Sequence, residues 1–136
     1  MHARAIDHVN LRFPPDRLAD VIDFYVDKLG FESPFDDPYE AVENDPGLFN
    51  ISLGEGIRLF VNPSEEFDGP ETNYRHMALQ IPETPQALRE HLVAEEIDIT
   101  SEAERHNAAV GAYTSYYVVD PFGYTVELMA IEKDAE

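Results

Sequence analysis

The sequence of 136 residues contains no cysteine and only two lysines, Lys28 and Lys133. The lack of cysteine excludes disulfides, thiolate metal sites and a cysteine nucleophile. No run of about 18 apolar residues is present to span a bilayer. The N-terminus opens directly into a strand pattern, without the apolar region of a signal peptide. We therefore expect a cytoplasmic protein with no membrane partner.

Basic residues are also scarce, with 9 against 28 acidic residues and a net charge of −19. Such a surface repels nucleic acid, which is recognised through clustered Lys and Arg, so no nucleic-acid partner is expected. The acidic residues are spread along the chain and 43% of residues are apolar, unlike a disordered acidic tail. A carboxylate-rich, lysine-poor surface is typical of halophile-like proteins, because high salt screens the self-repulsion.

The most informative feature present is an internal repeat. Residues 6–11 (IDHVNL) and 74–79 (YRHMAL) are strand-like, and His8 and His76 stand at the same point of this pattern, half a chain apart. Each segment precedes an amphipathic helix and then further strands. We therefore predict a single domain, residues 1–136, made of two modules of about residues 1–63 and 74–136.

The predicted elements follow the same order in both modules. The first has a strand at 5–13, a helix at 16–29 capped by Asp16, a short strand at 31–35, an acidic loop at 36–47, and strands at 48–53 and 57–62 joined by a hairpin turn at 54–56. After a linker at 63–73, the second has a strand at 74–81, a helix that begins near Pro85 after Thr84 or Glu83, a strand-like segment at 97–99, a loop at 101–111, and strands at 113–119 and 124–131 around a tight turn at 120–123. This order predicts an α+β fold.

Alternation within four strands separates an apolar face from a mixed face. The mixed face carries His8, Asn10, Arg12, Arg58, Phe60, Asn62, His76, Ala78, Gln80, Thr125, Glu127 and Met129. A solvated sheet face would explain polar residues there. A curved sheet that cups a polar pocket better explains two histidines, a glutamate and an arginine among apolar groups.

Glu127 lies in the last strand of the second module, and the equivalent position of the first module holds Arg58. If the modules pack about a pseudo-twofold axis, both histidines and Glu127 converge and form a facial triad with open coordination positions. Such ligands suit Fe(II), Mn(II), Zn(II), Co(II) and Ni(II) rather than calcium. A metal-free alternative is an ion pair between Arg58 and Glu127, which would neutralise a buried carboxylate.

The repeat, its two histidines and the segment Tyr117–Glu127 (YVVDPFGYTVE) resemble the vicinal oxygen chelate superfamily of glyoxalases, extradiol dioxygenases and bleomycin-resistance proteins. The resemblance covers nearly the whole chain. It implies tandem βαβββ modules that form an eight-stranded, cupped and barrel-like mixed sheet with the helices outside. It also implies a divalent metal held by His8, His76 and Glu127, to which substrate oxygens bind. Many members form dimers, so a homodimer is among the assemblies implied.

Departures from individual families narrow the chemistry. Arg58 cannot ligate a metal, although glyoxalase I has a fourth ligand at that position. Cations expected for phosphonate binding are missing between residues 107 and 115. The extradiol pattern matches better, with Tyr117 on its tyrosine. Its catalytic histidine would fall at 108–110, where this chain has Ala-Ala-Val, with His106 slightly upstream.

Three functions follow as hypotheses. The leading one is a metal-dependent enzyme acting on a small molecule with vicinal oxygens, with an extradiol-type Fe(II) site favoured and Mn, Zn, Ni or Co as other metals. Tyr117 and His106 are its catalytic candidates, and Arg58, Asn10, Gln80 and Phe60 are its substrate-binding candidates. The second is a glyoxalase-type isomerase or lyase. The third is a non-catalytic binding protein of the bleomycin-resistance kind with the ion pair between Arg58 and Glu127.

Overall fold

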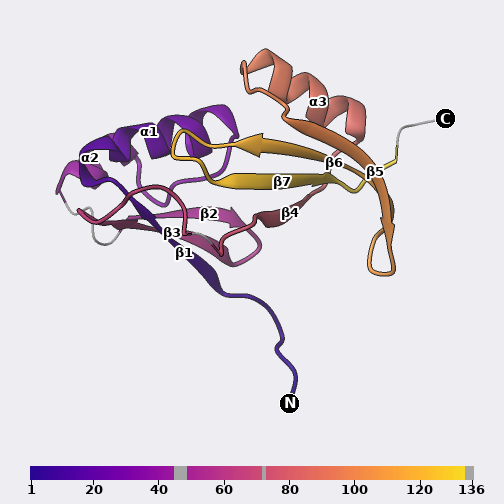
Figure 1. Cartoon of the computed structure of the whole chain (residues 1–136), viewed down its shortest axis with the longest axis horizontal. Coiled ribbons are helices and arrows are strands. Elements are labelled where there is room, and N and C mark those ends of the chain that lie inside the picture. The colour runs from indigo at the N-terminus through magenta and orange to yellow at the C-terminus, as the bar shows by residue number, and fades with distance from the viewer. Residues whose placement is uncertain (45–48, 72, 134–136) are drawn as a thin grey trace. The chain divides into compact units, whose positions relative to one another are not determined.

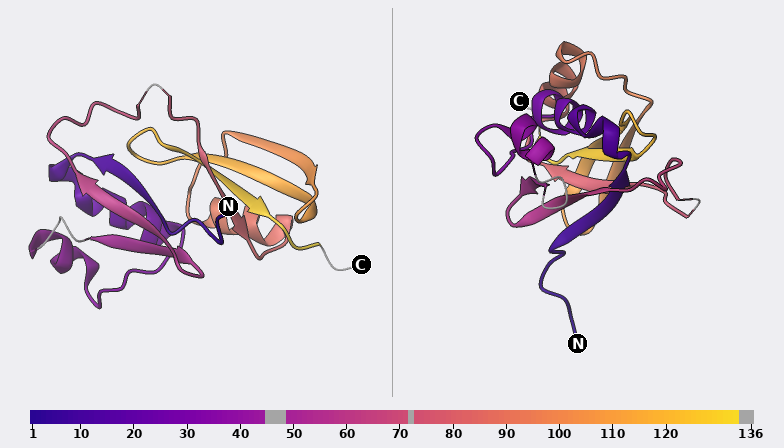
Figure 2. Two further views of the ribbon diagram at one scale, coloured as in Figure 1. Left: turned by 90° about the horizontal axis from the view of Figure 1, so that it is seen from below. Right: turned by 90° about the vertical axis from the view of Figure 1, so that its left-hand side faces the viewer.

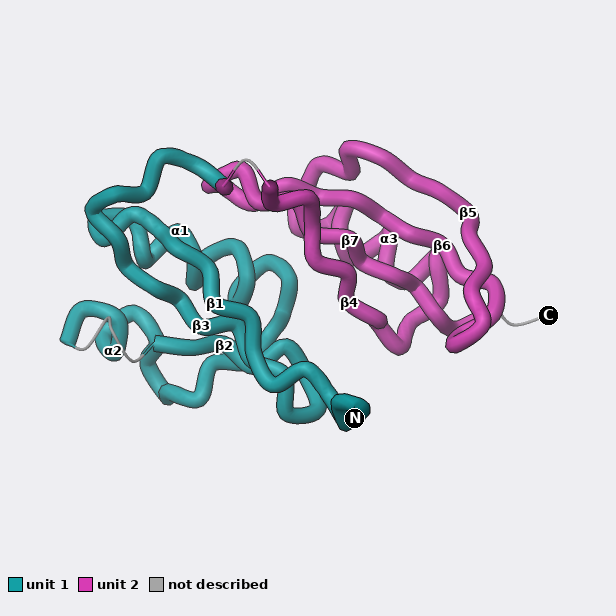
Figure 3. The backbone as a smooth tube through the Cα atoms, turned by 60° about the horizontal axis from the view of Figure 1, so that its bottom comes forward, with its two compact units in different colours: residues 1–70 teal, residues 71–136 magenta. Residues whose placement is uncertain are grey.

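The computed structural model describes residues 1–44, 49–71 and 73–133. The chain divides into two compact units, residues 1–70 and 71–136 (Figure 3). The boundary falls within the segment 63–73 that the sequence assigns to a linker.

The first unit has a three-stranded sheet with the order β1-β3-β2 (Figure 1). Strand β1 (His8–Phe13) runs parallel to β3 (Ile57–Pro63), and β2 (Asn50–Gly54) pairs with β3 in antiparallel fashion. The β2–β3 turn contains Gly54, Glu55 and Gly56, all with positive φ, which confirms the predicted hairpin. Position 48 of the predicted strand 48–53 lies outside the described residues.

One helical stretch covers this sheet (Figures 1 and 2). It begins with a 3₁₀ turn, η1 (Pro15–Arg17), continues as α1 (Leu18–Ile22) and ends as a π-helical segment, η2 (Asp23–Lys28). The core consists of buried residues of the helix and of the apolar strand faces: Leu11, Phe13, Leu18, Val21, Ile22, Phe24, Tyr25, Ile51, Leu59 and Val61. The predicted cap was wrong: Asp16 lies inside the first turn, which has no side-chain cap.

Two other elements of this unit differ from the prediction. Part of the segment predicted as an acidic loop forms a short helix, α2 (Pro38–Asn44), because Asp37 accepts a hydrogen bond from the backbone N–H of Glu40 at 3.2 Å. Residues 45–47 of the predicted loop lie outside the described residues. The predicted strand at 31–35 shrinks to a bridge between Glu32 and Ser52. The next hydrogen-bonding position is Pro34, which has no N–H to donate.

The second unit has a four-stranded sheet with the order β4-β7-β6-β5 (Figure 1). Strand β4 (Met77–Ile81) runs parallel to β7 (Thr125–Ala130), and β6 (Gly111–Val119) pairs antiparallel with β7. Helix α3 (Pro85–Ala94) lies along one face, where the Tyr116 hydroxyl donates to the carbonyl of Pro85 at 3.0 Å. Thr84 caps this helix by accepting from the N–H of Ala87 at 3.2 Å, which confirms the predicted start.

Strand β5 (Ser101–Asn107) replaces the loop predicted at 101–111, and the strand predicted at 97–99 is not formed. The sequence of β5, SEAERHN, shows no apolar alternation. The strand lies at the edge of the sheet and pairs only with β6, so charged side chains are tolerated on it.

The expectation of one eight-stranded, barrel-like sheet is therefore corrected. The described residues form an α+β protein with two mixed sheets, one of three strands and one of four, and no closed barrel. Among these residues, no helix has the length and the apolar composition that a bilayer span requires.

Candidate functional site

Glu127 is the centre of a polar cluster within the second unit. It lies in β7, where it is only 6% exposed, although a carboxylate is costly to bury without partners. The Ser115 hydroxyl of β6 donates to its Oε2 at 2.6 Å, and His76 Nε2 lies 3.1 Å from its Oε1. Both carboxylate oxygens are thus held, one by each neighbour.

Sheet register explains why these side chains meet. Glu127 pairs with Ala78 of β4 and with Tyr117 of β6, so His76, two residues before Ala78, projects from the same face as Glu127. The other face of the sheet carries the buried Val126 and Leu128. The mixed face predicted from alternation is therefore observed in this unit.

Tyr117 and Arg105 extend the cluster. The Tyr117 ring meets the His76 ring edge-on, with centroids 5.6 Å apart and planes at 87°. The guanidinium carbon of Arg105, in β5, lies 5.9 Å from the centroid of the Tyr117 ring. Burial, followed by hydrogen bonding to Glu127 and the charge of Glu127, raises the pKa of the Tyr117 phenol, while Arg105 opposes this shift.

The candidates of the first unit share the mixed face of its own sheet. His8 pairs with Arg58 and Asn10 pairs with Phe60. The His8 ring stacks on Phe60 with centroids 4.2 Å apart and planes at 9°. His8 Nδ1 lies 2.8 Å from a carboxylate oxygen of Asp7.

Arg58 donates to the side-chain oxygen of Asn50 at 3.0 Å, which gives the guanidinium a neutral partner on the same face as His8. In the second unit, Gln80 is exposed and lies beside Met129 on the face of Glu127. His106 pairs with Ala112 of β6. Ala112 stands five residues before Tyr117, so the side chains of Ala112 and His106 project from the face opposite to that of Tyr117 and Glu127. The acid/base role of His106 stays a prediction that this register does not support.

The sequence profile of the Glyoxalase/Bleomycin resistance protein/Dioxygenase superfamily matches residues 5–128, which is most of the chain and spans most of both modules. This chain belongs to that superfamily. The resemblance inferred from the repeat is thereby confirmed. None of the curated proteins matches the chain.

Solved structures show the same fold in other members and relatives. A glyoxalase/dioxygenase from Nostoc punctiforme is 18% identical, with a TM-score of 0.72 over 96% of this chain and 92% of that chain. A virulence protein from Salmonella typhimurium is 19% identical, with a TM-score of 0.71 over 97% and 100%. A glyoxalase/bleomycin resistance protein/dioxygenase from Alicyclobacillus acidocaldarius is 18% identical, with a TM-score of 0.64 over 96% and 94%.

The residues of this superfamily member fit part of a divalent-metal site. Two ligands at right angles on one ion, with bonds of about 2.1 Å, lie about 3 Å apart. The 3.1 Å between His76 Nε2 and Glu127 Oε1 agrees with this spacing, which also suits a hydrogen bond without an ion. Within each unit as described, no group of three or more His, Asp or Glu side chains is arranged to hold a metal. The second unit thus supplies two donors.

Ser115 and Arg105 were missed by the sequence analysis. Ser115 stands two positions before Tyr117, so a search of the Tyr117 face of β6 would have found it. Arg105 was missed because its segment was predicted as a loop, in which no face can be assigned. Pairing of β6 with β7 places Ser115 beside Glu127, and pairing of β5 with β6 places Arg105 near Tyr117.

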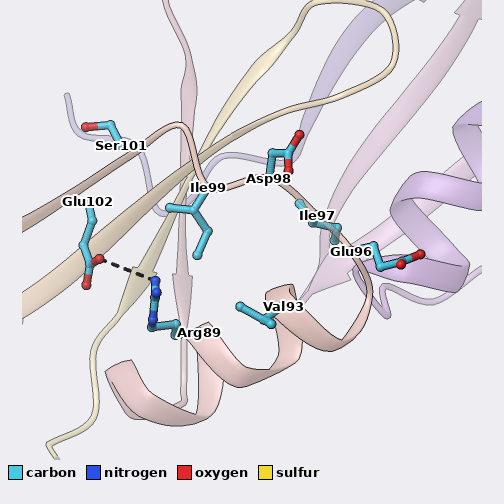
Figure 4. A pocket seen from close by; sticks show the side chains of 8 residues that line it. All are labelled: Arg89, Val93, Glu96, Ile97, Asp98, Ile99, Ser101 and Glu102. Atoms are coloured by element: carbon cyan, nitrogen blue, oxygen red, sulfur yellow. Dashed lines mark ion pairs between the residues drawn. The ribbon is translucent and has the colours of Figure 1, made fainter.

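An open pocket of about 470 Å³ occupies a different part of the second unit (Figure 4). It lies between the C-terminal half of α3 and the start of β5, on the helix side of the sheet. Its lining residues are Arg89, Val93, Glu96, Ile97, Asp98, Ile99, Ser101 and Glu102. Arg89 and Glu102 form an ion pair across it at 3.7 Å. The pocket shares no residue with the cluster around Glu127.

Substitution of Glu127 by glutamine is expected to lower the pKa of Tyr117 towards the usual tyrosine value, because the negative charge that opposes the phenolate is removed. The measurement is the ultraviolet absorbance of phenolate during an alkaline titration, with Tyr117→Phe subtracted to isolate this residue from the other tyrosines. An unchanged Tyr117 titration in Glu127→Gln would contradict the contact.

Proposed function

We propose that this protein is a divalent-metal-dependent enzyme that acts on a small molecule with two vicinal oxygens. His8, His76 and Glu127 are its three metal ligands. The observation that carries the proposal is the buried Glu127 carboxylate, fixed by Ser115 and adjacent to His76. His8 is proposed as the third ligand because it occupies, in the first module, the position that His76 occupies in the second. Imidazole and carboxylate together suit Fe(II), Mn(II), Zn(II), Co(II) and Ni(II).

A bound metal supplies Lewis-acid polarisation of the substrate oxygens. The chain's own residues then orient the substrate. Tyr117 holds its proton at neutral pH as tyrosines ordinarily do, and burial and Glu127 raise its pKa further. It is therefore able to donate a hydrogen bond to a substrate oxygen. Arg58 orients an anionic phenolate oxygen of the substrate, and Asn10 and Gln80 offer neutral hydrogen bonds. Phe60, whose ring stacks on His8, provides an apolar wall beside the substrate.

Within this class we favour an extradiol-type dioxygenase with Fe(II), because three protein ligands leave open positions for a bidentate catechol and for dioxygen. The segment from Tyr117 to Glu127 resembles that family best. Binding of metal and substrate in this proposal does not require His106 to act as an acid or a base. A glyoxalase-type isomerase would instead need a fourth ligand at the position of Arg58.

Oxygen uptake with catechols distinguishes the two reactions. Protein reconstituted anaerobically with Fe(II) should consume dioxygen in proportion to the catechol that loses its aromatic absorbance. The control variant is Glu104→Gln, which removes one negative charge, as Glu127→Gln does, but from an exposed residue on the other face of the sheet. It should keep this activity, and Glu127→Gln should lose it. Absence of uptake with catechols, together with isomerisation of thiol hemiacetals, would replace the dioxygenase assignment by the isomerase.

Replacement of Ser115 by alanine should weaken metal binding by about 10- to 100-fold, the usual cost of losing an outer partner of a metal ligand. Ser115 donates at 2.6 Å to Glu127 and fixes its carboxylate plane. Calorimetric titration with Zn(II) measures the change, with Thr114→Ala on the opposite face of the same strand as the control. If Ser115→Ala and Thr114→Ala bind Zn(II) with equal affinity, Ser115 does not support the metal ligand Glu127.

A further inference from the structure

Arg105 lies on the face of the second sheet that carries Glu127. Its partner in β6 is Tyr113, an even number of residues before Tyr117, so all three side chains project from one face. The flanking acids Glu102 and Glu104 project from the other face. Arg105 is exposed, and its guanidinium lies over the Tyr117 ring.

The partners of Arg105 differ from those of Arg17 and Arg89, which form ion pairs with carboxylates. Arg17 pairs with Asp20 at 2.9 Å and Arg89 pairs with Glu102 at 3.7 Å. Arg105 interacts with Tyr117, and in the described part of the chain no carboxylate forms an ion pair with it. A guanidinium carries five N–H donors, so Arg105 can contact Tyr117 and still donate to another acceptor.

Arg105 is a local positive charge in a strongly acidic protein. The chain carries −19, so its overall field repels anions and gives no general affinity for them. A substrate that is itself anionic therefore requires a local cation. A guanidinium matches a carboxylate with two parallel hydrogen bonds, a geometry that a lysine cannot provide.

We propose that Arg105 is a specificity-determining residue that binds a carboxylate of the substrate. The substrate class is then a small organic acid that has a carboxylate in addition to two vicinal oxygens, such as a dihydroxybenzoate. This inference rests on the proposed function for the vicinal oxygens. It assigns the carboxylate to Arg105 and a neighbouring oxygen to the Tyr117 hydroxyl.

The test compares an acidic probe with a neutral one on the intact, tag-free protein. The probes are 3,4-dihydroxybenzoate and 4-methylcatechol, titrated calorimetrically into metal-free protein and into protein loaded with Zn(II), which does not support oxygenation. The wild type should prefer the acid by about 10- to 100-fold, the range of a charge-assisted hydrogen-bond pair. Arg105→Gln should abolish this preference and leave the neutral probe unchanged, and Arg105→Lys should restore part of it.

Arg89→Gln is the matched control, since it removes the same charge from the helix side of the same unit. The proposal is overturned if wild type binds both probes equally, if neither probe binds, or if Arg105→Gln loses no more preference than Arg89→Gln. Failure of the proposed function is separate. A protein that takes up no metal but keeps an Arg105-dependent preference for the acid supports this inference and contradicts the metal-dependent enzyme.

Discussion

Glu127→Gln should reduce the affinity for divalent metal by more than the roughly 10- to 100-fold that loss of an outer hydrogen-bond partner costs. The substitution keeps the size of the side chain but removes the anionic ligand. The neighbours of Glu127 remain in place, because Ser115 can donate to an amide oxygen as it does to the carboxylate. The change therefore tests charge and ligation rather than folding.

Calorimetric titration with Mn(II) and Zn(II) measures the loss, and circular dichroism checks that the variant is folded. Glu104→Gln, which removes an exposed charge from β5, is the matched control and should bind as the wild type does. If Glu127→Gln and Glu104→Gln bind metal equally well, Glu127 is no ligand.

Asp120→Ala should lower the free energy of unfolding by about 2–4 kcal/mol. Asp120 is only 4% exposed, and its Oδ1 accepts from the backbone N–H of Phe122 at 2.9 Å and of Tyr124 at 2.8 Å. Alanine leaves both donors buried without this acceptor. The turn that they close connects β6 to β7, so its loss also affects the strands that carry Tyr117 and Glu127.

Urea denaturation measures this effect, with two comparisons. Asp120→Asn keeps an oxygen acceptor and should cost less, while Asp98→Ala removes an exposed aspartate and should change stability by no more than about 0.5 kcal/mol. A loss in Asp120→Ala as small as that in Asp98→Ala would show that the two hydrogen bonds do not hold the turn.

The faces of the sheets could be predicted from the sequence because strand alternation has a strict period. Apolar residues such as Leu59 and Leu128 mark the helix side, so His8, His76 and Glu127 had to project from the other side of their own sheets. Turn chemistry was equally local: Pro121 and Gly123 define the β6–β7 turn without help from distant residues.

Features that depend on a pairing partner were not predictable. Strand β5 has no apolar pattern and exists because β6 offers it an edge, which in turn gives Arg105 its place beside Tyr117. The segment around Glu32 has strand-like composition, yet Pro34 limits its pairing to one bridge. The eight-stranded sheet that the resemblance implied is not formed, and the segment around Glu32 contributes only this bridge.

The central claim, that the two equivalent histidines and Glu127 bind one metal ion, is tested most directly by the metal stoichiometry of protein purified without a polyhistidine tag. After exposure to Fe(II), Mn(II), Zn(II) or Ni(II) and removal of free metal, elemental analysis should find one ion per chain in the wild type and in His2→Ala. His8→Ala, His76→Ala and Glu127→Gln should each lose it. A wild-type protein that retains none of these metals, or a His8→Ala variant that retains a full equivalent, would contradict the claim.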